Sequence, residues 1–459
     1  MKVERIKTDV AVVGAGMAGC GAAAVLAKSG LTAVVIEKQG RIGGTAVAAG
    51  VNNFEPGVSA GECHRLLAER LIAAGKGQVQ ESVKELPCAQ TGEFWGLSVK
   101  SADGYEATLR RSGLTRGEWR RFVFDDEAME TELRNLIKSD RVTLLTDTEF
   151  ADCDVRNHRI ETIRCHRKDG TVLEITARRF IDAGGEIELA RKSGCKATKL
   201  AESRDVYNEP SAPDQAAEKL NGVTYVFQLS KSLEKQLENP LSSFSDQTEQ
   251  WLKEAKACGF CSFIVTKPDG DLNVNMLPTM AGDEYFADGE AARQNCLERV
   301  YRYAEYLTEH PAFKGYHLSK IFPFPGIREH WRLVGKTVLT QNDILIDFRK
   351  HPNRADFISI ADHPMDIHGE NGICAKVDNP YGIPYSCLLP NEISNLLVAC
   401  RGASFSHLAA SSCRLSRTML SLGESAALAV IQAAERGIEL ENVNPEPIFE
   451  INIKDELIQ

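Results

Sequence analysis

The sequence predicts a three-layer α/β protein, with a doubly wound nucleotide-binding domain that carries an antiparallel β-meander and with an inserted α+β domain. Three observations predict this fold. A short apolar run, a glycine-rich turn and an alanine-rich run follow one another in residues 8–38. Three strand-like runs joined by short polar turns fill residues 142–183. A buried-strand pattern and a long helical pattern follow in residues 394–436.

The first element is a β-α-β unit. Thr8–Val13 is a short apolar run that ends at a glycine, which is typical of a buried parallel strand. Met17–Lys28 predicts a helix that stops at Gly30, and Leu31–Ile36 predicts the second strand. The order strand, turn, helix, strand implies a right-handed crossover in a doubly wound sheet.

The turn between strand and helix has the dinucleotide-binding spacing Gly14-x-Gly16-x-x-Gly19. The first glycine permits the tight turn, the second lets the backbone approach a pyrophosphate, and the third lets helix and strand pack closely. The helix N-terminus offers N–H groups to phosphates, and Glu37 can accept hydrogen bonds from ribose. Alternatively, the glycines serve only turn and packing. The residues expected at the nucleotide are Gly14, Ala15, Gly16, Met17, Ala18, Gly19, Glu37 and Lys38.

A second loop of small residues begins at Gly43-Gly44-Thr45 and runs to Gly50. A nicotinamide-dependent enzyme would normally continue into another crossover helix at this point. Because a small-residue loop can instead pass close to an extended cofactor, Gly43, Gly44 and Thr45 are predicted cofactor contacts. The alternative is a flexible surface loop.

The rest of the chain supplies further strands and helices. Residues 60–135 look mostly helical, and the runs in 142–183 predict the meander. A strand is expected at Ser394–Cys400 and a helix from about Ser411 to Arg436. We assign residues 1–60, 136–204 and 386–459 to the nucleotide-binding domain, and residues 61–135 and 205–385 to a substrate, or cap, domain.

Composition excludes several functions. The chain has 459 residues and a formal net charge of -10 without a basic tail, so nucleic acid is a poor candidate partner. No run of 18 or more apolar residues predicts a membrane span. The 13 cysteines lack zinc or iron–sulfur spacing, so we expect no metal site and a cytoplasmic protein with reduced thiols. The N-terminal run could pass for a signal peptide, but its glycines fit a strand–turn–helix better.

Together these features resemble an FAD-dependent oxidoreductase of the glutathione-reductase type: GAGMAGCGAA, Glu37, the GGT loop, the meander with its D-A-x-G turn and the late glycine-bearing helix. More narrowly, three segments are similar to the bacterial family allied to fumarate reductase and succinate dehydrogenase flavoproteins, which includes the flavin module of heterodisulfide reductase. The segments are residues 326–345, 380–390 and 395–430. The resemblance implies that FAD also contacts Ala183, Gly184, Gly185, Arg401 and Gly423.

The sequence departs from the family's pattern at three places. Asp182–Glu186 reads D-A-G-G-E where the family has D-A-T-G-D, Trp331 replaces an arginine of G-x-R-E-x-R-R, and G-E-S-A-A at Gly423 stands for G-Q-A-A-G. Gly423 would meet the pyrimidine edge of the flavin or, alternatively, pack between helices. Residues 41–53 contain no histidine for the covalent flavin linkage of succinate dehydrogenase, so we expect noncovalent FAD.

No second G-x-G-x-x-G follows a strand, so we expect no separate nicotinamide domain. Electrons would pass between the substrate and an unidentified donor or acceptor. Cys258 and Cys261, in CGFC, could form a redox disulfide or be two buried structural thiols. The oligomeric state stays open.

Two histidines are predicted to transfer the proton, because the unperturbed imidazole pKa lies near neutrality. Asp366 stands two residues before His368, so on an extended segment both side chains point the same way and the aspartate can orient the imidazole. The resemblance includes this D-x-H stretch, although His368 could also be a surface-loop histidine. His407, in the S-x-x-H segment with Ser404, is the second candidate.

Three arginines are predicted to grip a carboxylate or an oxyanion, because a guanidinium offers bidentate donors: Arg328, Arg332 and Arg414. Each could equally be a structural ion-pair arginine. The sequence as a whole therefore predicts an FAD-dependent dehydrogenase or reductase that moves a hydride between flavin N5 and a small polar or carboxylate-bearing substrate. The alternatives are an electron-transfer subunit of an iron–sulfur complex, a tRNA-modifying FAD protein and an NAD(P) dehydrogenase.

Overall fold

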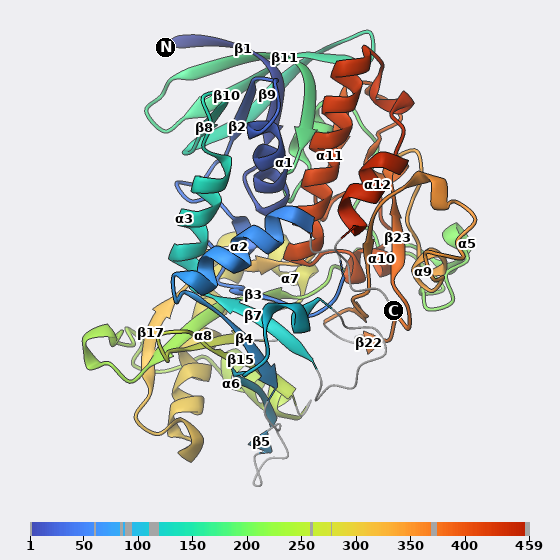
Figure 1. The fold of residues 1–459 in the computed structure, drawn as a ribbon. Helices are drawn as coiled ribbons and strands as arrows, with labels where there is room; N and C mark the ends of the chain where they lie inside the picture. The colour runs from blue at the N-terminus through green and yellow to red at the C-terminus, as the bar shows by residue number, and fades with distance from the viewer. Residues whose placement is uncertain are drawn as a thin grey trace.

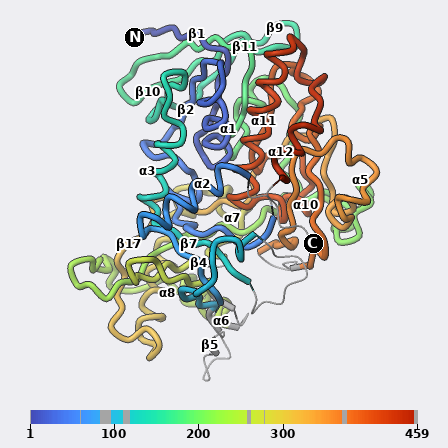
Figure 2. Tube along the Cα trace, viewed as in Figure 1, coloured from blue at the N-terminus to red at the C-terminus, as the bar shows by residue number. Residues whose placement is uncertain are grey.

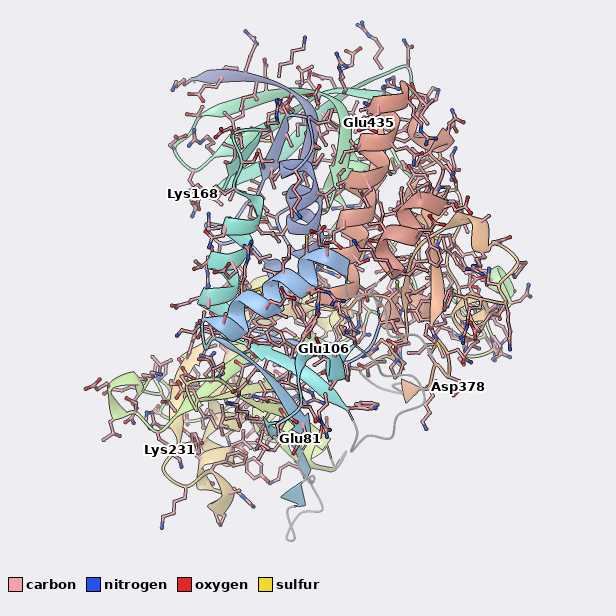
Figure 3. All side chains as sticks on the ribbon, viewed as in Figure 1. Glu81, Glu106, Lys168, Lys231, Asp378 and Glu435 are labelled. Atoms are coloured by element: carbon pink, nitrogen blue, oxygen red, sulfur yellow. The ribbon has the colours of Figure 1, made fainter. Side chains whose placement is uncertain are left out.

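The computed structural model describes residues 2–58, 61–82, 86–87, 94–109, 119–257, 260–276, 278–368 and 374–454. Within them the chain forms two halves, each built around one large sheet (Figure 1, Figure 2). Charged side chains such as Lys168 and Glu435 on the first half and Lys231 on the second point outward (Figure 3). Cys258 and Cys261, which could form a redox disulfide or be two buried structural thiols, have side chains that lie outside the described part of the structure.

The first half contains a seven-stranded sheet ordered β8-β2-β1-β11-β10-β9, with β24 beside β11. β1 lies parallel to both β2 and β11, and β8 and β24 are parallel to their neighbours. β9, β10 and β11 are antiparallel. The predicted doubly wound sheet with a meander is confirmed. Its strands are β1 (Val3–Val13), β2 (Ala33–Ile36), β8 (Val142–Leu145), β9 (Thr148–Arg156), β10 (Arg159–Arg167), β11 (Val172–Asp182) and β24 (Leu396–Val398).

Residues 142–155, expected as one strand of the meander, form two strands. β8 pairs in parallel with β2, and only β9 enters the meander. The chain turns between them at Asp147, whose φ of 49° lies in the left-handed region. The backbone N–H of Asp147 donates to the carbonyl of Gln39 at 3.1 Å, which fixes the turn at the end of β2.

Helix α1 (Met17–Ala27) packs along α11 (Ser416–Arg436) (Figure 1). A Cβ at Gly21 would lie 2.3 Å from the carbonyl oxygen of Leu420, so the two backbones meet where a side chain has no room. The helix expected from about Ser411 is two helices, because α10 (His407–Ser412) ends before α11 begins. α11 ends at Gly437, a left-handed C-cap with a φ of 63°.

The second half contains a nine-stranded sheet ordered β17-β14-β16-β15-β6-β4-β7-β3, with β5 beside β6. Residues 60–135, expected to be mostly helical, contribute several of its strands between α2 (Gly61–Ala73) and α3 (Asp126–Ile137). That expectation was wrong because β4 has a single apolar residue, Val79, and a polar residue, Gln80, is buried beside it, so the segment lacks an apolar strand pattern. The strands are β3 (Asn53–Phe54), β4 (Gly77–Ser82), β5 (Leu86–Pro87), β6 (Phe94–Lys100), β7 (Arg120–Phe124), β14 (Val226–Ser230), β15 (Phe260–Thr266), β16 (Leu272–Met276) and β17 (His317–Ile321).

Two hydrophobic cores lie under these sheets. The smaller core joins α8 (Gly289–Glu309) to the second sheet, through residues such as Phe227, Val274 and Tyr303. The larger core lies under the first sheet and also takes in Leu333 and Tyr381. The domain boundaries given above stay a prediction. The buried residues of the smaller core lie between Tyr225 and Leu318, which is a shorter part of the chain than the predicted cap domain.

Shorter helices and strands complete the fold. The remaining helices are α4 (Glu188–Lys192), α5 (Arg204–Tyr207), α6 (Asp246–Ala257), α7 (Gly282–Ala287), α9 (Gln341–Ile344) and α12 (Glu446–Ile453). The remaining strands are β12 (Ala197–Thr198), β13 (Val223–Thr224), β18 (Gly326–Ile327), β19 (Arg332–Leu333), β20 (Phe357–Ala361), β21 (Met365–Asp366), β22 (Cys374–Ala375) and β23 (Tyr381–Pro384).

Among the described helices, none is both long and apolar enough to cross a membrane. Nine cysteines with described side chains are free thiols, and the cytoplasmic location stays a prediction.

Direct contacts hold the second sheet against the first half. The amide of Asn273, on β16, donates to the carbonyl of Gly50 at 2.9 Å. Lys320, on β17, forms an ion pair of 2.8 Å with Asp126 at the start of α3. The first contact places β16 against the loop that follows β2, and the second places β17 against the start of α3.

Candidate active site

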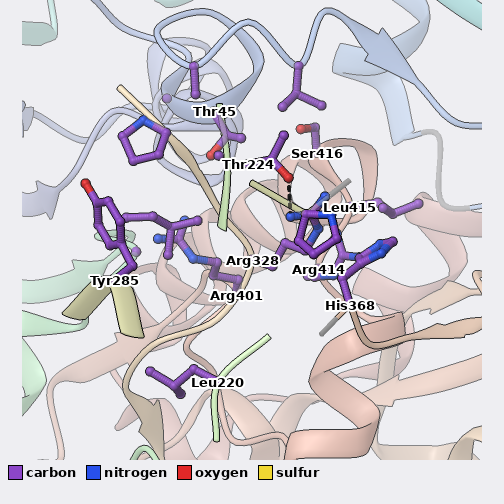
Figure 4. A pocket seen from close by; sticks show the side chains of 18 of the residues that line it. Thr45, Leu220, Thr224, Tyr285, Arg328, His368, Arg401, Arg414, Leu415 and Ser416 are labelled. Atoms are coloured by element: carbon purple, nitrogen blue, oxygen red, sulfur yellow. Dashed lines mark hydrogen bonds between the residues drawn. The ribbon is translucent and has the colours of Figure 1, made fainter. Parts of the chain in front are cut away.

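A cavity of about 2320 Å³ lies between the two halves. It is lined both by the turn after β1 and by residues 326–328, 363–368 and 400–417 from later in the chain. In Figure 4, Arg328, Arg414 and His368 gather at one side of the cavity and Tyr285 lies at another. Sites for drug-sized ligands occupy about 300–1,000 Å³, so this cavity has room for an extended cofactor and a substrate.

The glycine-rich turn lines one end of the cavity, and its geometry explains its residues. Gly14 has a φ of 98°, and a Cβ there would lie 2.8 Å from the backbone nitrogen of Gly184. A Cβ at Gly19 would lie 1.9 Å from the carbonyl oxygen of Gly14. Gly16 is the N-cap of α1 and has no side chain to cap the first N–H groups. The turn therefore brings backbone donors and the positive end of a helix dipole to the cavity.

Glu37 lies beside this turn at the end of β2 and lines the cavity. Its carboxylate accepts hydrogen bonds from the backbone N–H groups of Ala15, at 2.8 Å, and Gln39, at 3.0 Å. Burial raises the pKa of Glu37, and these two hydrogen bonds oppose the rise. A carboxylate has about four acceptor positions, so Glu37 can still accept from the hydroxyls of a ribose.

The second small-residue loop runs against the first turn. The N–H of Gly43 donates to the carbonyl of Ala15 at 2.8 Å. A Cβ at Gly44 would lie 3.0 Å from the Cα of Gly16. Gly44 and Thr45 line the cavity, whereas Gly43 supports the loop from behind. Backbone contacts that exclude side chains thus hold the loop against the first turn, and its close passage to the cofactor stays a prediction.

The D-A-G-G-E turn forms the next part of the wall. The carboxylate of Asp182 accepts from the N–H groups of Gly184, at 3.0 Å, and Ala190, at 2.9 Å, and burial raises its pKa to about 7. The guanidinium of Arg401 lies against Gly185, where a Cβ would come within 2.2 Å of it. Arg401 Nε is buried and has no hydrogen-bond partner among the described residues. An unpaired buried donor of this kind fits a polar cofactor that carries negative charge.

The residues present therefore fit FAD. One end of the cavity is surrounded by four features: uncapped helix N–H groups, an acceptor for ribose, two small-residue loops and an arginine with an unused donor. Among the described residues, no cluster of three or more histidine, cysteine or acidic side chains could hold a metal ion. The predicted cofactor residues that line the cavity are Gly14, Gly16, Met17, Ala18, Glu37, Lys38, Gly44, Thr45, Ala183, Gly184, Gly185 and Arg401.

At the substrate end, Asp366 and His368 form the predicted pair. His368 Nε2 lies 2.9 Å from Asp366 Oδ2. Because an ionised carboxylate only accepts, Nε2 carries the proton and Nδ1 remains an acceptor. Burial lowers the pKa of His368, and the charge of Arg328 lowers it further, while Asp366 opposes both. Burial raises the pKa of Asp366, but His368 and Arg414 outweigh it and keep that pKa below its usual range.

Two of the predicted arginines share this end of the cavity. Arg414 Nη2 donates to Asp366 Oδ2 at 3.1 Å, and Arg414 Nε is buried without a hydrogen-bond partner in the described chain. Arg328 donates to the carbonyl of Gly222 at 2.6 Å and to the Thr224 hydroxyl. Burial, together with the charge of Arg414, lowers the pKa of Arg328 to about 9. Two guanidinium groups close to a single carboxylate favour binding of an anion.

His407 also lines the cavity. Its Nδ1 lies 2.9 Å from Glu329 Oε1, which by the same reasoning leaves its Nε2 as an acceptor. Glu329 is buried, but its hydrogen bond with His407 and the charge of Arg332 outweigh burial and lower its pKa. Within the described part of the chain, each of the two predicted histidines therefore has a carboxylate partner on one ring nitrogen and no hydrogen bond on the other.

Arg332, which the sequence offered as a substrate-binding residue, does not line the cavity. It is fully buried, outside the cavity lining, and forms ion pairs with Glu329 and, at 2.6 Å, with Glu202. Its Nε donates to the carbonyl of Phe405 at 3.0 Å. The ion-pair alternative is the correct one for Arg332, because two buried carboxylates use its donors.

Gly423 also does not line the cavity, contrary to the prediction that it contacts the flavin. A Cβ there would lie 1.8 Å from the carbonyl oxygen of Ala18, so Gly423 allows α11 to cross α1. Among the other predicted cofactor residues, Ala15, Gly19 and Gly43 are supports behind the wall rather than parts of it. Each of them contacts the turn through its backbone.

Sequence reasoning missed residues 221–224, the segment that binds His368 and Arg328. Asn221 and Gly222 bind both through hydrogen bonds, and Thr224 lines the cavity. The one available signal was the N-G dipeptide, which marks a turn but says nothing about residues more than 100 positions away.

A family model covers nearly the whole chain. The model of a family described as FAD dependent oxidoreductase matches residues 9–452. Among solved structures, a geranylgeranyl bacteriochlorophyll reductase-like protein from Thermoplasma acidophilum is 12% identical, with 98% of this chain and 84% of that chain covered and a TM-score of 0.48. The p-nitrophenol 4-monooxygenase of Pseudomonas putida DLL-E4 is 11% identical, with 99% and 87% covered and a TM-score of 0.43.

A flavoprotein/dehydrogenase from Cytophaga hutchinsonii is 14% identical, with 98% of this chain and 83% of that chain covered and a TM-score of 0.43. No curated protein matches the sequence. The family expected from the sequence is the one whose model matches.

Proposed function

The chain belongs to the FAD-dependent oxidoreductase family, and we propose that it transfers a hydride between noncovalently bound FAD and a small polar or carboxylate-bearing substrate. FAD, when bound, supplies the hydride acceptor or donor at its N5 atom. One observation carries the proposal: His368, Arg328 and Arg414 converge at one end of a cavity whose other end is the nucleotide turn. Residues at both ends therefore serve a single site.

His368 takes the proton in the oxidative direction. Its neutral imidazole, with Nε2–H held by Asp366, presents Nδ1 as the base. A substrate hydroxyl or C–H acid gives its proton to this atom as the adjacent C–H bond gives up two electrons as a hydride. In the reductive direction the same nitrogen returns the proton. His407 Nε2 is the alternative base, because it has the equivalent partner in Glu329.

Arg328 and Arg414 hold the substrate. The buried, unpaired Nε of Arg414 can donate to a substrate carboxylate. The low pKa of Arg328 makes an anionic partner favourable, since a nearby negative charge stabilises its charged form. Electrons then leave to, or arrive from, an unidentified partner, because the sequence contains no second dinucleotide-binding motif.

The test is an anaerobic titration of the purified protein with hydroxy acids, sugars and amino acids. We expect the flavin absorbance to bleach with at least one carboxylate-bearing or polar compound. A protein that neither contains nor binds FAD would contradict the cofactor assignment. Bleaching by strongly apolar compounds alone would contradict the substrate class.

His368→Ala should retain FAD but lose about 10²–10⁴-fold in the rate constant of flavin reduction, the usual contribution of a general base. Because the pKa of His368 is lowered, the wild-type rate should be level at neutral pH and fall as the pH drops through that pKa. Stopped-flow reduction over a pH series measures both effects. His166→Ala, at an exposed histidine on β10, is the matched control. Unchanged kinetics in His368→Ala would transfer the role to His407.

A further inference from the structure

The two histidines of the site are tied to each other by one buried residue, Asn221. It is 1% exposed and does not line the cavity. Its side-chain oxygen accepts from the backbone N–H of His368 at 3.0 Å, and its side-chain nitrogen donates to the backbone carbonyl of Asp366 at 2.9 Å. Its own backbone N–H donates to Glu329 Oε2 at 2.9 Å.

Gly222 extends this connection to the substrate-binding arginine. Its N–H donates to the carbonyl of His368 at 2.9 Å, and its carbonyl accepts from Arg328 at 2.6 Å. A Cβ at Gly222 would lie 3.1 Å from the carbonyl oxygen of His368 and 2.6 Å from Pro278. The chain at Asn221–Gly222 therefore lies in direct contact with the segment that ends at His368.

We propose that Asn221 is a positioning residue that holds the Asp366–His368 pair in register with the His407–Glu329 pair and, through Gly222, with Arg328. This inference rests on the proposed function, in which His368 or His407 moves the proton. The Asn221 side chain binds backbone atoms on both sides of residue 367, so it fixes the direction of the segment that presents the imidazole. Glu329 receives hydrogen bonds from both Asn221 and His407, so one carboxylate couples the two sides.

The amide group suits this arrangement. One side must accept from an N–H and the other must donate to a C=O, and a side-chain amide does both at once from two separate atoms, its oxygen and its nitrogen. An aspartate at this position would keep the acceptor but lose the donor, and a valine would leave the backbone N–H of His368 without its partner and the carbonyl of Asp366 with Arg414 alone. A displacement of about 1 Å in a catalytic group can cost about 10²-fold in rate, so a small loss of register should be measurable.

The chain offers a closely matched control in Asn395. It is 2% exposed, and its side-chain oxygen accepts from the N–H of Ile160 at 2.9 Å. Its side-chain nitrogen donates to the carbonyls of Ile160 and Arg178. Asn395 thus does for the first sheet what Asn221 does for the site, at the same burial but outside the cavity lining.

The test compares the FAD-loaded wild-type protein with Asn221→Ala and Asn395→Ala. Diethyl pyrocarbonate, which modifies unprotonated imidazole, is applied over a pH series, and the modification of His368 is followed by peptide mass spectrometry. The groups that act on the His368 pKa are Asp366, Arg328 and Arg414, together with burial. The rate of labelling plotted against pH has an inflection at the pKa of His368. In Asn221→Ala we expect this inflection to move up toward 6.5, the ordinary pKa of histidine, because the imidazole gains contact with water.

Asn395→Ala should leave the inflection where it is. With a substrate from the titration panel, Asn221→Ala should also reduce the flavin about 10- to 100-fold more slowly and with a shifted pH profile. If Asn221→Ala does not fold, Asn221→Ser, which keeps one hydroxyl donor, takes its place. Equal labelling of His368 in the wild type and the Asn221 variant, including none in either, would overturn the proposal.

The labelling needs no substrate, so it separates the two hypotheses. Failure of every compound to bleach the flavin would contradict the proposed function and leave the labelling result intact. An unchanged inflection with normal substrate reduction would contradict the role of Asn221 alone.

Discussion

The two ends of the cavity differ in how far apart in the chain their residues lie. At the nucleotide end, Gly14 meets Gly19, and Glu37 binds the N–H of Ala15, within a single β-α-β unit. At the substrate end, Arg414 reaches Asp366 and Asn221 reaches His368, from segments separated by 48 and 147 residues. The first end therefore has a local centre, to which Gly184 and Arg401 are added from later in the chain, whereas the second end is assembled wholly by the tertiary fold.

The two ends also differ in what holds them. Steric limits dominate the nucleotide end, where backbone atoms approach so closely that only glycine fits. Charge dominates the substrate end, where several arginines and histidines share few carboxylates. A substitution at the nucleotide end should therefore act through steric clashes, whereas a substitution at the substrate end should act by leaving a charged side chain without its partner.

The largest effect should come from Arg332→Ala, which breaks the support of the substrate end. It would leave Glu329 and Glu202 buried without their cation. Loss of one partner from a buried ion pair costs about 3–5 kcal/mol in the free energy of unfolding. Denaturation at a fixed FAD concentration measures it. Arg349→Ala, which breaks the half-exposed pair with Asp347, should cost less than about 1 kcal/mol, and equal losses in the two variants would contradict the buried-pair argument.

Gly14→Ala should have the next largest effect and should act on the nucleotide end. The left-handed φ costs about 1–2 kcal/mol for a residue with a Cβ, and the contact of 2.8 Å with Gly184 adds strain. We expect FAD binding to weaken about 30- to 1,000-fold, equivalent to about 2–4 kcal/mol.

Titration of the apoprotein with FAD measures this change. Gly30→Ala is the control in the same β-α-β unit, because a Cβ at Gly30 meets nothing within 4 Å. If the two variants bind FAD equally well, the steric account of this end is wrong.

The smallest effect should come from Glu424→Gln, behind the nucleotide end. Glu424 accepts from the N–H of Cys63 at 2.7 Å, and burial raises its pKa from 4.5 to about 7. Between these values the folded protein keeps a proton that the unfolded chain has lost, so stability falls as pH rises through this window. At about 1.4 kcal/mol per pKa unit the loss is at most about 3 kcal/mol.

Glu424→Gln cannot ionise and should remove this slope. The variant should match the wild type near pH 4.5 and be more stable than it above pH 7. Thermal unfolding across this pH range measures the difference, with the exposed Glu435→Gln as the control. Parallel curves for wild type and Glu424→Gln would show that Glu424 does not titrate in the window.

How far the sequence reaches differs from element to element. The turn at Gly14–Gly19 and the meander were predictable because their signals lie in neighbouring residues. The strands in residues 60–135 were not, because polar residues such as Gln78 and the fully buried Gln80 stand where a buried strand would normally carry apolar side chains. Arg332 and Arg328 look alike in sequence, and only the fold shows that Arg332 is paired with the buried carboxylates of Glu202 and Glu329 whereas Arg328 lines the cavity.

The sequence by itself determined the cofactor class and the nucleotide end, because glycine spacing and an acid at the end of a strand act over a few residues. It also predicted that His368 and Asp366 act together, because side chains two residues apart on an extended segment point the same way. Only the tertiary structure decided that Gly423 packs against Ala18, that Arg332 is structural and that Asn221 joins both histidines. These roles depend on contacts between distant segments, and no local pattern encodes which distant partner a buried side chain will meet.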